Sequence, residues 1–176
     1  MTEPLAVEFA NTWHAVRGKE RESVGTPSEL SAWLHEHHLP ADPDEPAVQD
    51  FTALRDAIRS LLHATAEGEP LPEEAKATLN EASEQAPRWP VLAGTAESGY
   101  AVIEVASADP LPAAQARIAR DAIALLGGPL RADLRACQAP GCVQYFVKDH
   151  PRREWCSAAC GNRARVARHY TKIKDS

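Results

Sequence analysis

All four cysteines of this 176-residue chain lie within 24 positions, as two close pairs separated by thirteen residues. The first pair is Cys137 with Cys142, and the second is Cys156 with Cys160. Each pair can supply two ligands from one tight piece of backbone, and the insert lets the second pair fold back to complete a tetrahedron. Four sulfur ligands favour zinc. The spacing therefore predicts one Zn²⁺ bound by all four cysteines.

The local sequence around the cysteines supports a small metal-closed module. The Pro-Gly pair at 140–141 predicts a tight turn inside the first cysteine pair. Residues 143–147 are β-branched and aromatic and predict a strand, and residues 148–151 predict a turn. Ser157 is a good helix N-cap, so Cys160 would lie in the first helical turn, where the helix dipole favours thiolate. This order is typical of a treble-clef-like finger.

Other roles for the cysteines are less consistent with the sequence. Two disulfides are an alternative, but no signal peptide precedes them and a chain of this length can bury a core without covalent links. A redox pair or a catalytic thiol would not account for four cysteines. His150 or His169 could replace one cysteine as a ligand, although four sulfurs already fill the site. Since a closed shell leaves no open position for water and no catalytic motif occurs, we do not expect an enzyme.

The C-terminal motif resembles that of a known family. The Cys-x4-Cys pair is followed by Phe146 and then by the run Arg-Arg-Glu-Trp-Cys-Ser-Ala-Ala-Cys-Gly-Asn-Arg at 152–163. This pattern resembles the CGNR zinc finger of bacterial proteins, and the literal Cys-Gly-Asn-Arg at 160–163 makes the match specific. The triplet Lys-Asp-His at 148–150 departs from the Asp-x-Ser expected there. This difference affects the predicted tip of the hairpin and not the predicted metal site.

The earlier part of the chain resembles the domain that precedes this finger in the same family. Residues 5–12, 31–34 and 54–58 are similar to the ABATE domain, so the resemblance spans nearly the whole chain. Members of this family are described as proposed stress-induced transcription regulators. The resemblance implies that this chain binds zinc and regulates transcription.

Charge is distributed unevenly along the chain, whose formal net charge is −6. Residues 1–130 contain nine Lys and Arg against 21 Asp and Glu, a formal charge of −12, whereas residues 131–176 contain ten against four, a formal charge of +6. Only the C-terminal part would therefore approach a polyanion. Zinc with four thiolates carries a charge of about −2, which reduces this basicity.

The last predicted helix, about Ser157 to Lys172, has a basic face and a separate apolar stripe. We expect the stripe of Val166, Tyr170 and Ile173 to pack while the basic face stays free for phosphates. A solvated helix with no partner is the alternative. The candidate nucleic-acid contacts on this helix and the preceding loop are Arg152, Arg153, Arg163, Arg165, Arg168 and Lys172.

The N-terminal residues 1–18 predict a helix, because Leu5, Phe9 and Trp13 recur at helical spacing. Polar side chains beside this stripe could line a ligand pocket, although they could equally cap the helix or face water. The candidate ligand-binding residues are Asn11, His14 and Arg17, with Thr12 beside them.

The remaining pattern predicts a mainly α fold with a small β-hairpin. A capping box at Thr26-Pro-Ser-Glu29 starts one helix, and further helices are expected at 47–67, from residue 71, and at 112–126. Two strands at 89–92 and 100–105 form a hairpin that we expect to lie against the helices, because a two-stranded ribbon alone is marginal. His35, His37 and His38 could bind a metal but are expected to be solvated.

The boundary between two predicted domains falls at Gly127-Gly128-Pro129. Residues 1–128 would form the ABATE-like helical domain with the hairpin, and residues 129–176 the treble-clef-like CGNR zinc finger with its basic helix.

Two functional hypotheses follow. In the first, the chain is a cytoplasmic transcription regulator whose finger contacts DNA and whose N-terminal domain senses a small-molecule signal or forms a homodimer. In the second, the zinc is purely structural and the basic helix meets an acidic protein surface, which could be the chain's own N-terminal domain. No apolar run is long enough for a membrane span, so we expect no membrane partner.

Overall fold

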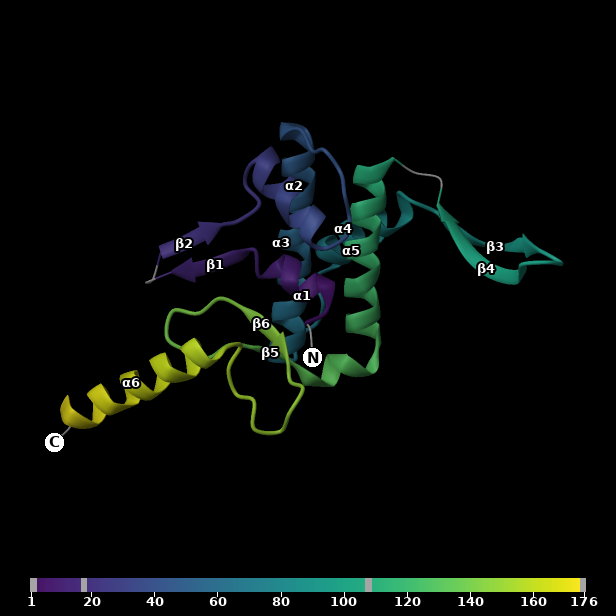
Figure 1. Ribbon diagram of the computed structural model, residues 1–176. Helices are drawn as coiled ribbons and strands as arrows, with labels where there is room; N and C mark the ends of the chain where they lie inside the picture. Colours follow the sequence, from purple (N-terminus) through teal and green to yellow (C-terminus); the bar gives the residue numbers. More distant parts are fainter. Residues whose placement is uncertain (1–2, 17–18, 107–108, 175–176) are drawn as a thin grey trace.

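The computed structural model describes residues 3–16, 19–106 and 109–174 of the chain, which form a helical body with smaller strand pairs around it (Figure 1). The described elements are α1 (Leu5–Ala10), β1 (Trp13–Val16), β2 (Lys19–Glu22), α2 (Pro27–Glu36), α3 (Glu45–Glu67), α4 (Glu73–Glu84), β3 (Arg88–Thr95), β4 (Gly99–Ala106), α5 (Pro110–Gly127), the 3-10 helix η1 (Pro129–Asp133), β5 (Leu134–Ala136), β6 (Tyr145–Val147) and α6 (Ala158–Lys174). The predicted fold class, mainly α with small strand pairs, is confirmed. None of the helices in these described ranges is long and apolar enough to cross a membrane.

Helix α3 lies at the centre of the body, and α1, α2, α4 and α5 pack around it. Its apolar residues recur at helical spacing, so they form one stripe that the other helices cover. This stripe is the core that the sequence predicts. Its buried members include Val48, Phe51, Leu54, Ile58, Leu61 and Leu62.

Local capping sets the ends of the central helices. Thr26 Oγ1 accepts a hydrogen bond from the backbone N–H of Glu29, as the predicted capping box requires, although the Thr26 hydroxyl also donates to the Glu29 carboxylate. Asp44 Oδ1 accepts from the N–H of Ala47 at 2.9 Å and starts α3 in the same way. Helix α3 ends at Glu67, and Gly68 is its C-cap, as predicted.

The N-terminal helix is shorter than the sequence predicts. Helix α1 ends at Ala10, and Trp13 lies in β1, which pairs with β2 in antiparallel register. The predicted helix over 1–18 is therefore wrong. The Thr12 hydroxyl bonds back to the carbonyl of Phe9 at 2.7 Å, and Asn11 is engaged by a distant strand, so the backbone turns where the helical stripe would have continued.

The β3–β4 hairpin forms where expected but does not lie against the helices. Its two strands pair in register from Arg88 opposite Ala106 to Thr95 opposite Gly99. Figure 1 shows the hairpin extending away from the helical body. The expectation that the hairpin packs against the helices is therefore wrong, because the strands carry apolar side chains on both faces and the body already has a closed core without them.

Side chains of the helical body form hydrogen bonds to backbone groups of residues 143–147 and so join the C-terminal module to the body. The Asn11 side-chain amide donates to the carbonyl of Tyr145 at 2.8 Å and accepts from its N–H at 2.9 Å. Glu3 accepts from the N–H of Val147 at 2.9 Å. Arg59 donates to the carbonyl of Val143 at 2.9 Å, and its guanidinium lies 5.3 Å from the Tyr145 ring centroid. The second strand of the module is therefore held by side chains of the helical body.

Replacing Asn11 by alanine removes both hydrogen bonds to Tyr145 and leaves two partly buried backbone groups unpaired. We expect Asn11→Ala to lower the free energy of unfolding by about 1–3 kcal/mol. Asn80→Ala, at an exposed position on α4, is the matched control and should change stability little. Urea unfolding followed by tryptophan fluorescence measures both variants, and equal stabilities would contradict the role assigned to Asn11.

Candidate metal centre

The four cysteines come from two turns and one helix end. Cys137 and Cys142 lie in the loop that joins β5 to β6, and the N–H of Cys142 bonds to the carbonyl of Ala139 at 2.9 Å. Gly141 occupies the left-handed region in this turn, with φ of 68°, which explains the Pro-Gly pair. Ser157 caps α6 by accepting from the N–H of Cys160 at 3.2 Å, so the predicted placement of Cys160 in the first helical turn is confirmed.

The predicted hairpin of the finger has a different arrangement. Strand β6 is shorter than the expected 143–147, and its partner is β5, which precedes the first cysteine pair. The turn expected at 148–151 forms slightly later, where the N–H of Arg153 bonds to the carbonyl of His150, and no second strand follows it before α6 in the described chain. The first cysteine pair therefore lies at the tip of the β5–β6 pair.

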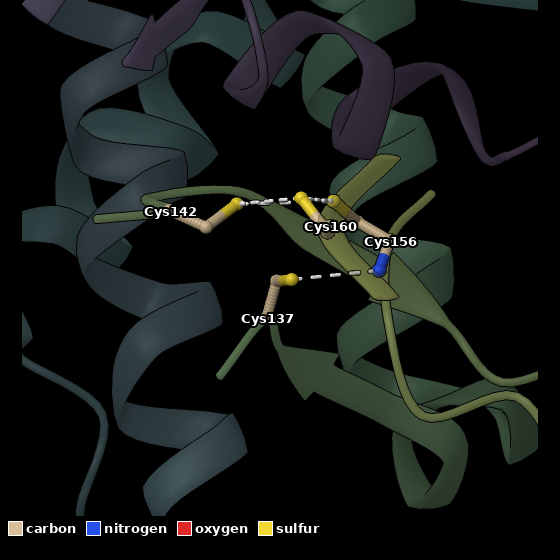
Figure 2. Close-up of side chains that lie close together, drawn as sticks. All are labelled: Cys137, Cys142, Cys156 and Cys160. Atoms are coloured by element: carbon tan, nitrogen blue, oxygen red, sulfur yellow. Dashed lines mark hydrogen bonds between the residues drawn. The ribbon is translucent and has the colours of Figure 1, made fainter. Parts of the chain in front are cut away.

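The four sulfur atoms converge on one point (Figure 2). All of them lie within 4.8 Å of one another. The Sγ atoms of Cys156 and Cys160 are 3.4 Å apart, those of Cys142 and Cys160 are 3.7 Å apart, and those of Cys142 and Cys156 are 3.8 Å apart. Sulfurs at about 2.3 Å from a tetrahedral zinc ion would be about 3.8 Å apart. The donor set and its dimensions therefore fit Zn²⁺.

Two donors beside the sulfurs favour their ionised form. The N–H of Cys156 approaches Cys137 Sγ at 3.5 Å, and Arg163 donates from Nη2 to Cys160 Sγ at 3.2 Å. A zinc ion with four thiolates has a net charge of about −2, so an adjacent guanidinium offsets part of it. Arg163 therefore contributes to the charge balance of the metal centre.

Without a cation, the four thiols do not ionise equally. Hydrogen bonding from Cys156 lowers the pKa of Cys142 to about 5, and the same interaction raises the pKa of Cys156 well above its usual range. Burial raises the pKa of Cys137. A single thiolate is therefore stabilised by its thiol neighbours, and ionising all four requires a bound cation.

A small apolar cluster covers the sulfurs. Phe146 is buried beside Cys137 and Cys160, and Trp155 packs against the same cluster. A Cβ atom at Gly161 would lie only 3.0 Å from the Trp155 ring, so glycine at this position allows the indole to approach the helix. Gly161 therefore allows Trp155 to pack closely beside the cysteine site.

The predicted nucleic-acid contacts lie in different environments. Arg152, Arg165 and Arg168 are exposed, and Arg165 bonds to the side chain of Asn162. Arg153 is half-buried, where it pairs with Glu3 at 2.5 Å and covers the Phe146 ring at 4.8 Å. The Lys172 and Ile173 side chains lie outside the described residues. The expectation that the apolar stripe of α6 packs is wrong for its two described members, Val166 and Tyr170, because the helix leaves the body and both are exposed.

Of the predicted ligand-binding residues, Asn11 and His14 lie in the described part of the chain, and both have partners within it. Asn11 is engaged by Tyr145, and His14 lies near the Thr12 carbonyl at 3.3 Å and the Ser23 hydroxyl at 3.4 Å. Arg17 lies outside the described residues. A ligand site here remains a prediction.

His35 and His38 are exposed, as expected, whereas His37 at the end of α2 is half-buried. His37 pairs with Glu8 at 3.3 Å and stacks on Trp33. Among the described residues, the one group placed to hold a metal is the cysteine cluster.

Sequence reasoning missed the residues that dock the module on the body. Glu3 and Arg59 each contact it through hydrogen bonds to backbone atoms of distant residues, which leave no periodic signal in the sequence. Burial lowers the pKa of Arg59, whose guanidinium is held by the carbonyls of Ala10 and Val143. For Arg59, the one indication in the sequence is that a charged residue lies beside the predicted buried stripe of α3.

The fold and the site define a helical protein that ends in a four-cysteine zinc finger. Residues 3–129 match the model of the ABATE family, described as "Putative stress-induced transcription regulator", and residues 134–172 match the CGNR zinc finger. The chain therefore belongs to the ABATE family and carries a CGNR zinc finger, as the resemblance implied. These families are of regulator and zinc-finger type and not of enzyme type. No curated protein matches the chain.

The purified, reduced chain should contain one zinc ion. We expect Cys160→Ser to lose most of this zinc, because the serine hydroxyl does not replace a thiolate ligand. Ala159→Ser, which adds the same hydroxyl at a neighbouring exposed position, is the control that should retain the metal. Elemental analysis after dialysis measures both variants. A metal-free wild-type chain that is fully folded would contradict the assignment of the site.

The uneven thiol pKa values predict the order in which the metal-free cysteines react. Because the pKa of Cys142 is lowered to about 5, it should be alkylated by iodoacetamide before Cys137 and Cys156 at neutral pH. Its rate should fall as the pH falls through about 5, since the thiolate is then protonated. Mass spectrometry of the digested protein gives the order, and zinc-loaded protein is the protected control. Faster reaction at Cys137 would contradict this prediction.

Proposed function

We propose that the chain is a transcription regulator that contacts DNA through its zinc finger and α6. The observation that carries this proposal is the position of α6, which extends away from the helical body with Arg165 and Arg168 exposed (Figure 1). In the part of the chain that the structure describes, neither arginine pairs with a carboxylate. Exposed guanidinium groups on a projecting helix suit contacts with DNA phosphates.

The surface at the start of α6 also favours an anionic partner. A shallow hollow there is lined by Arg152, Arg165, Trp155 and Ser157, among other residues, and also by one carboxylate, Glu154. Two exposed guanidinium groups beside the positive end of a helix can hold one phosphate, and the DNA backbone offers a row of them. The acidic residues 1–130, with a formal charge of −12, would keep the helical body away from the same strand.

The proposal gives separate tasks to the basic residues of the finger. Arg152, Arg165, Arg168 and Lys172 would contact phosphates. Arg153 and Arg163 would act mainly through the finger itself, because Arg153 holds Glu3 and Arg163 contacts Cys160 Sγ. In this proposal the helical body senses a small-molecule signal or dimerises, and the protein works in the cytoplasm.

A protein-interaction module with a structural zinc site is the second candidate. The exposed apolar residues Val166 and Tyr170 on α6 favour it, because an amphipathic helix can enter a groove of a partner protein. Masking of α6 by the acidic body is less consistent with a helix that leaves the body.

Titration of a zinc-loaded chain against duplex DNA at two salt concentrations tests the proposal. We expect affinity at low salt that weakens as salt rises, because phosphate contacts release counterions. Arg165→Ala combined with Arg168→Ala should weaken binding by about tenfold or more at low salt and reduce the salt dependence.

The matched control removes the same charge from the helical body. Arg21→Ala combined with Arg117→Ala changes two exposed arginines outside the finger, on β2 and α5, and should leave DNA affinity nearly unchanged. No binding of the wild-type chain at low salt, or equal losses in the two double variants, would contradict DNA contact through α6.

A further inference from the structure

The β3–β4 hairpin carries apolar side chains that no described part of the chain covers. Leu92, Tyr100 and Val102 are 70%, 65% and 71% exposed, and Trp89 and Ile103 are nearly half exposed. Figure 1 shows both strands pointing away from the helices. Since a two-stranded ribbon is marginal in water, these side chains indicate a missing partner.

The exposed area suits a modest protein interface. The five side chains together present on the order of 500 Å² of apolar surface, divided between two faces of the ribbon. Leu92, Tyr100 and Val102 lie on one face, and Trp89 and Ile103 lie on the other. A standard interface buries about 800 Å² per partner, and the strand edge and neighbouring backbone of the hairpin supply part of the difference.

One edge of the hairpin can accept another strand. Pro90 lies in β3 and has no N–H to donate, whereas every residue of β4 has one. Proline is confined to outer edges of sheets, so β3 is the outer strand and β4 offers the open edge. A partner that adds a strand would therefore pair with β4.

The charges of the hairpin favour a second copy of the chain over a charged partner. Arg88 and Glu104 pair with each other at 3.6 Å, and Glu97 in the turn is the one other charged residue between positions 88 and 106. The open edge of β4 is thus apolar apart from Glu104. A neutral, apolar strand edge on a body of formal charge −12 gives little attraction to nucleic acid but is complementary to itself.

We propose that β4 pairs antiparallel with β4 of a second copy, about a twofold axis at Val102. Leu92 is opposite Val102 in the hairpin, so this register forms one continuous row of Leu92, Val102, Val102 and Leu92 across four strands. Glu104 then faces Tyr100 of the second copy, and the two carboxylates stay apart. An axis at Ile103 would put Glu104 beside Val102, and an axis at Ala101 would put Ile103 opposite Gly99.

This dimer stands apart from DNA binding, because no residue of the finger takes part in it. It would give each assembly two zinc fingers, one on each helical body. Side chains stand roughly perpendicular to a sheet, so this pairing would cover the flanks of Val102 and Tyr100 along the seam and leave the two faces of the sheet open.

Sedimentation of the zinc-loaded, full-length chain tests the proposal directly. We expect a shift from the 19.1 kDa monomer to twice that mass across the micromolar range. A wild-type chain that stays monomeric up to its solubility limit would overturn the proposal, even if its hairpin captured a different protein.

Substitutions at the axis identify the surface. Val102→Asp and Val102→Lys each place two like charges opposite each other, and we expect each to weaken dimerisation by roughly a hundredfold. An equimolar mixture of the two variants should form heterodimers, because each Asp then faces a Lys. A misfolded hairpin could not regain dimerisation when the two variants are mixed. Circular dichroism and zinc content verify that each variant is folded.

Val166→Asp is the matched control, because it places the same charge at an exposed apolar position on α6. This variant should dimerise as the wild type does. Dimers of Val102→Asp as tight as the wild type, failure of the mixture to pair, or loss of dimers in Val166→Asp would each overturn the proposed interface.

Discussion

Ionisation of four neighbouring cysteines is the constraint on which the C-terminal part of the structure depends. Sulfur atoms within 4.8 Å of one another cannot all carry negative charge unless a cation lies among them. Zn²⁺ satisfies that requirement, and the loop holding Cys137 and the start of α6 are thereby joined at one point. The cluster around Phe146 is small, so the metal and the apolar cover act together to hold these segments.

The zinc finger and the helical body form a connected structure. Leu134, Tyr145 and Val147 of the β5–β6 pair belong to the same apolar core as the body helices, and Asn11 bonds to both backbone groups of Tyr145. Because β6 is bonded to Asn11 at the end of α1, the position of this strand in the finger depends on α1. A change in the body that moved Asn11 would therefore reach the strand beside the metal ligands.

Much of this organisation could be predicted from local sequence. The spacing of four cysteines predicted the metal centre, because ligand chemistry needs few residues at short separations. Caps and stripes predicted α2 and α3, because Thr26, Gly68 and the apolar residues between them act within one or two helical turns. The predictions that failed depend on distant partners. Helix α1 stops early where Asn11 is drawn to Tyr145, which lies 134 positions away.

The sequence by itself determined the four-cysteine cluster, the helical core and the basic character of the last helix, since each follows from residue types at short spacing. Only the tertiary structure decided that Arg153 and Arg163 bond within the chain, that Asn11 docks the finger, and that the β3–β4 hairpin and α6 project from the body. The physical reason is that apolar periodicity shows which residues avoid water but not what covers them. Which element covers a given apolar residue depends on how the whole core closes.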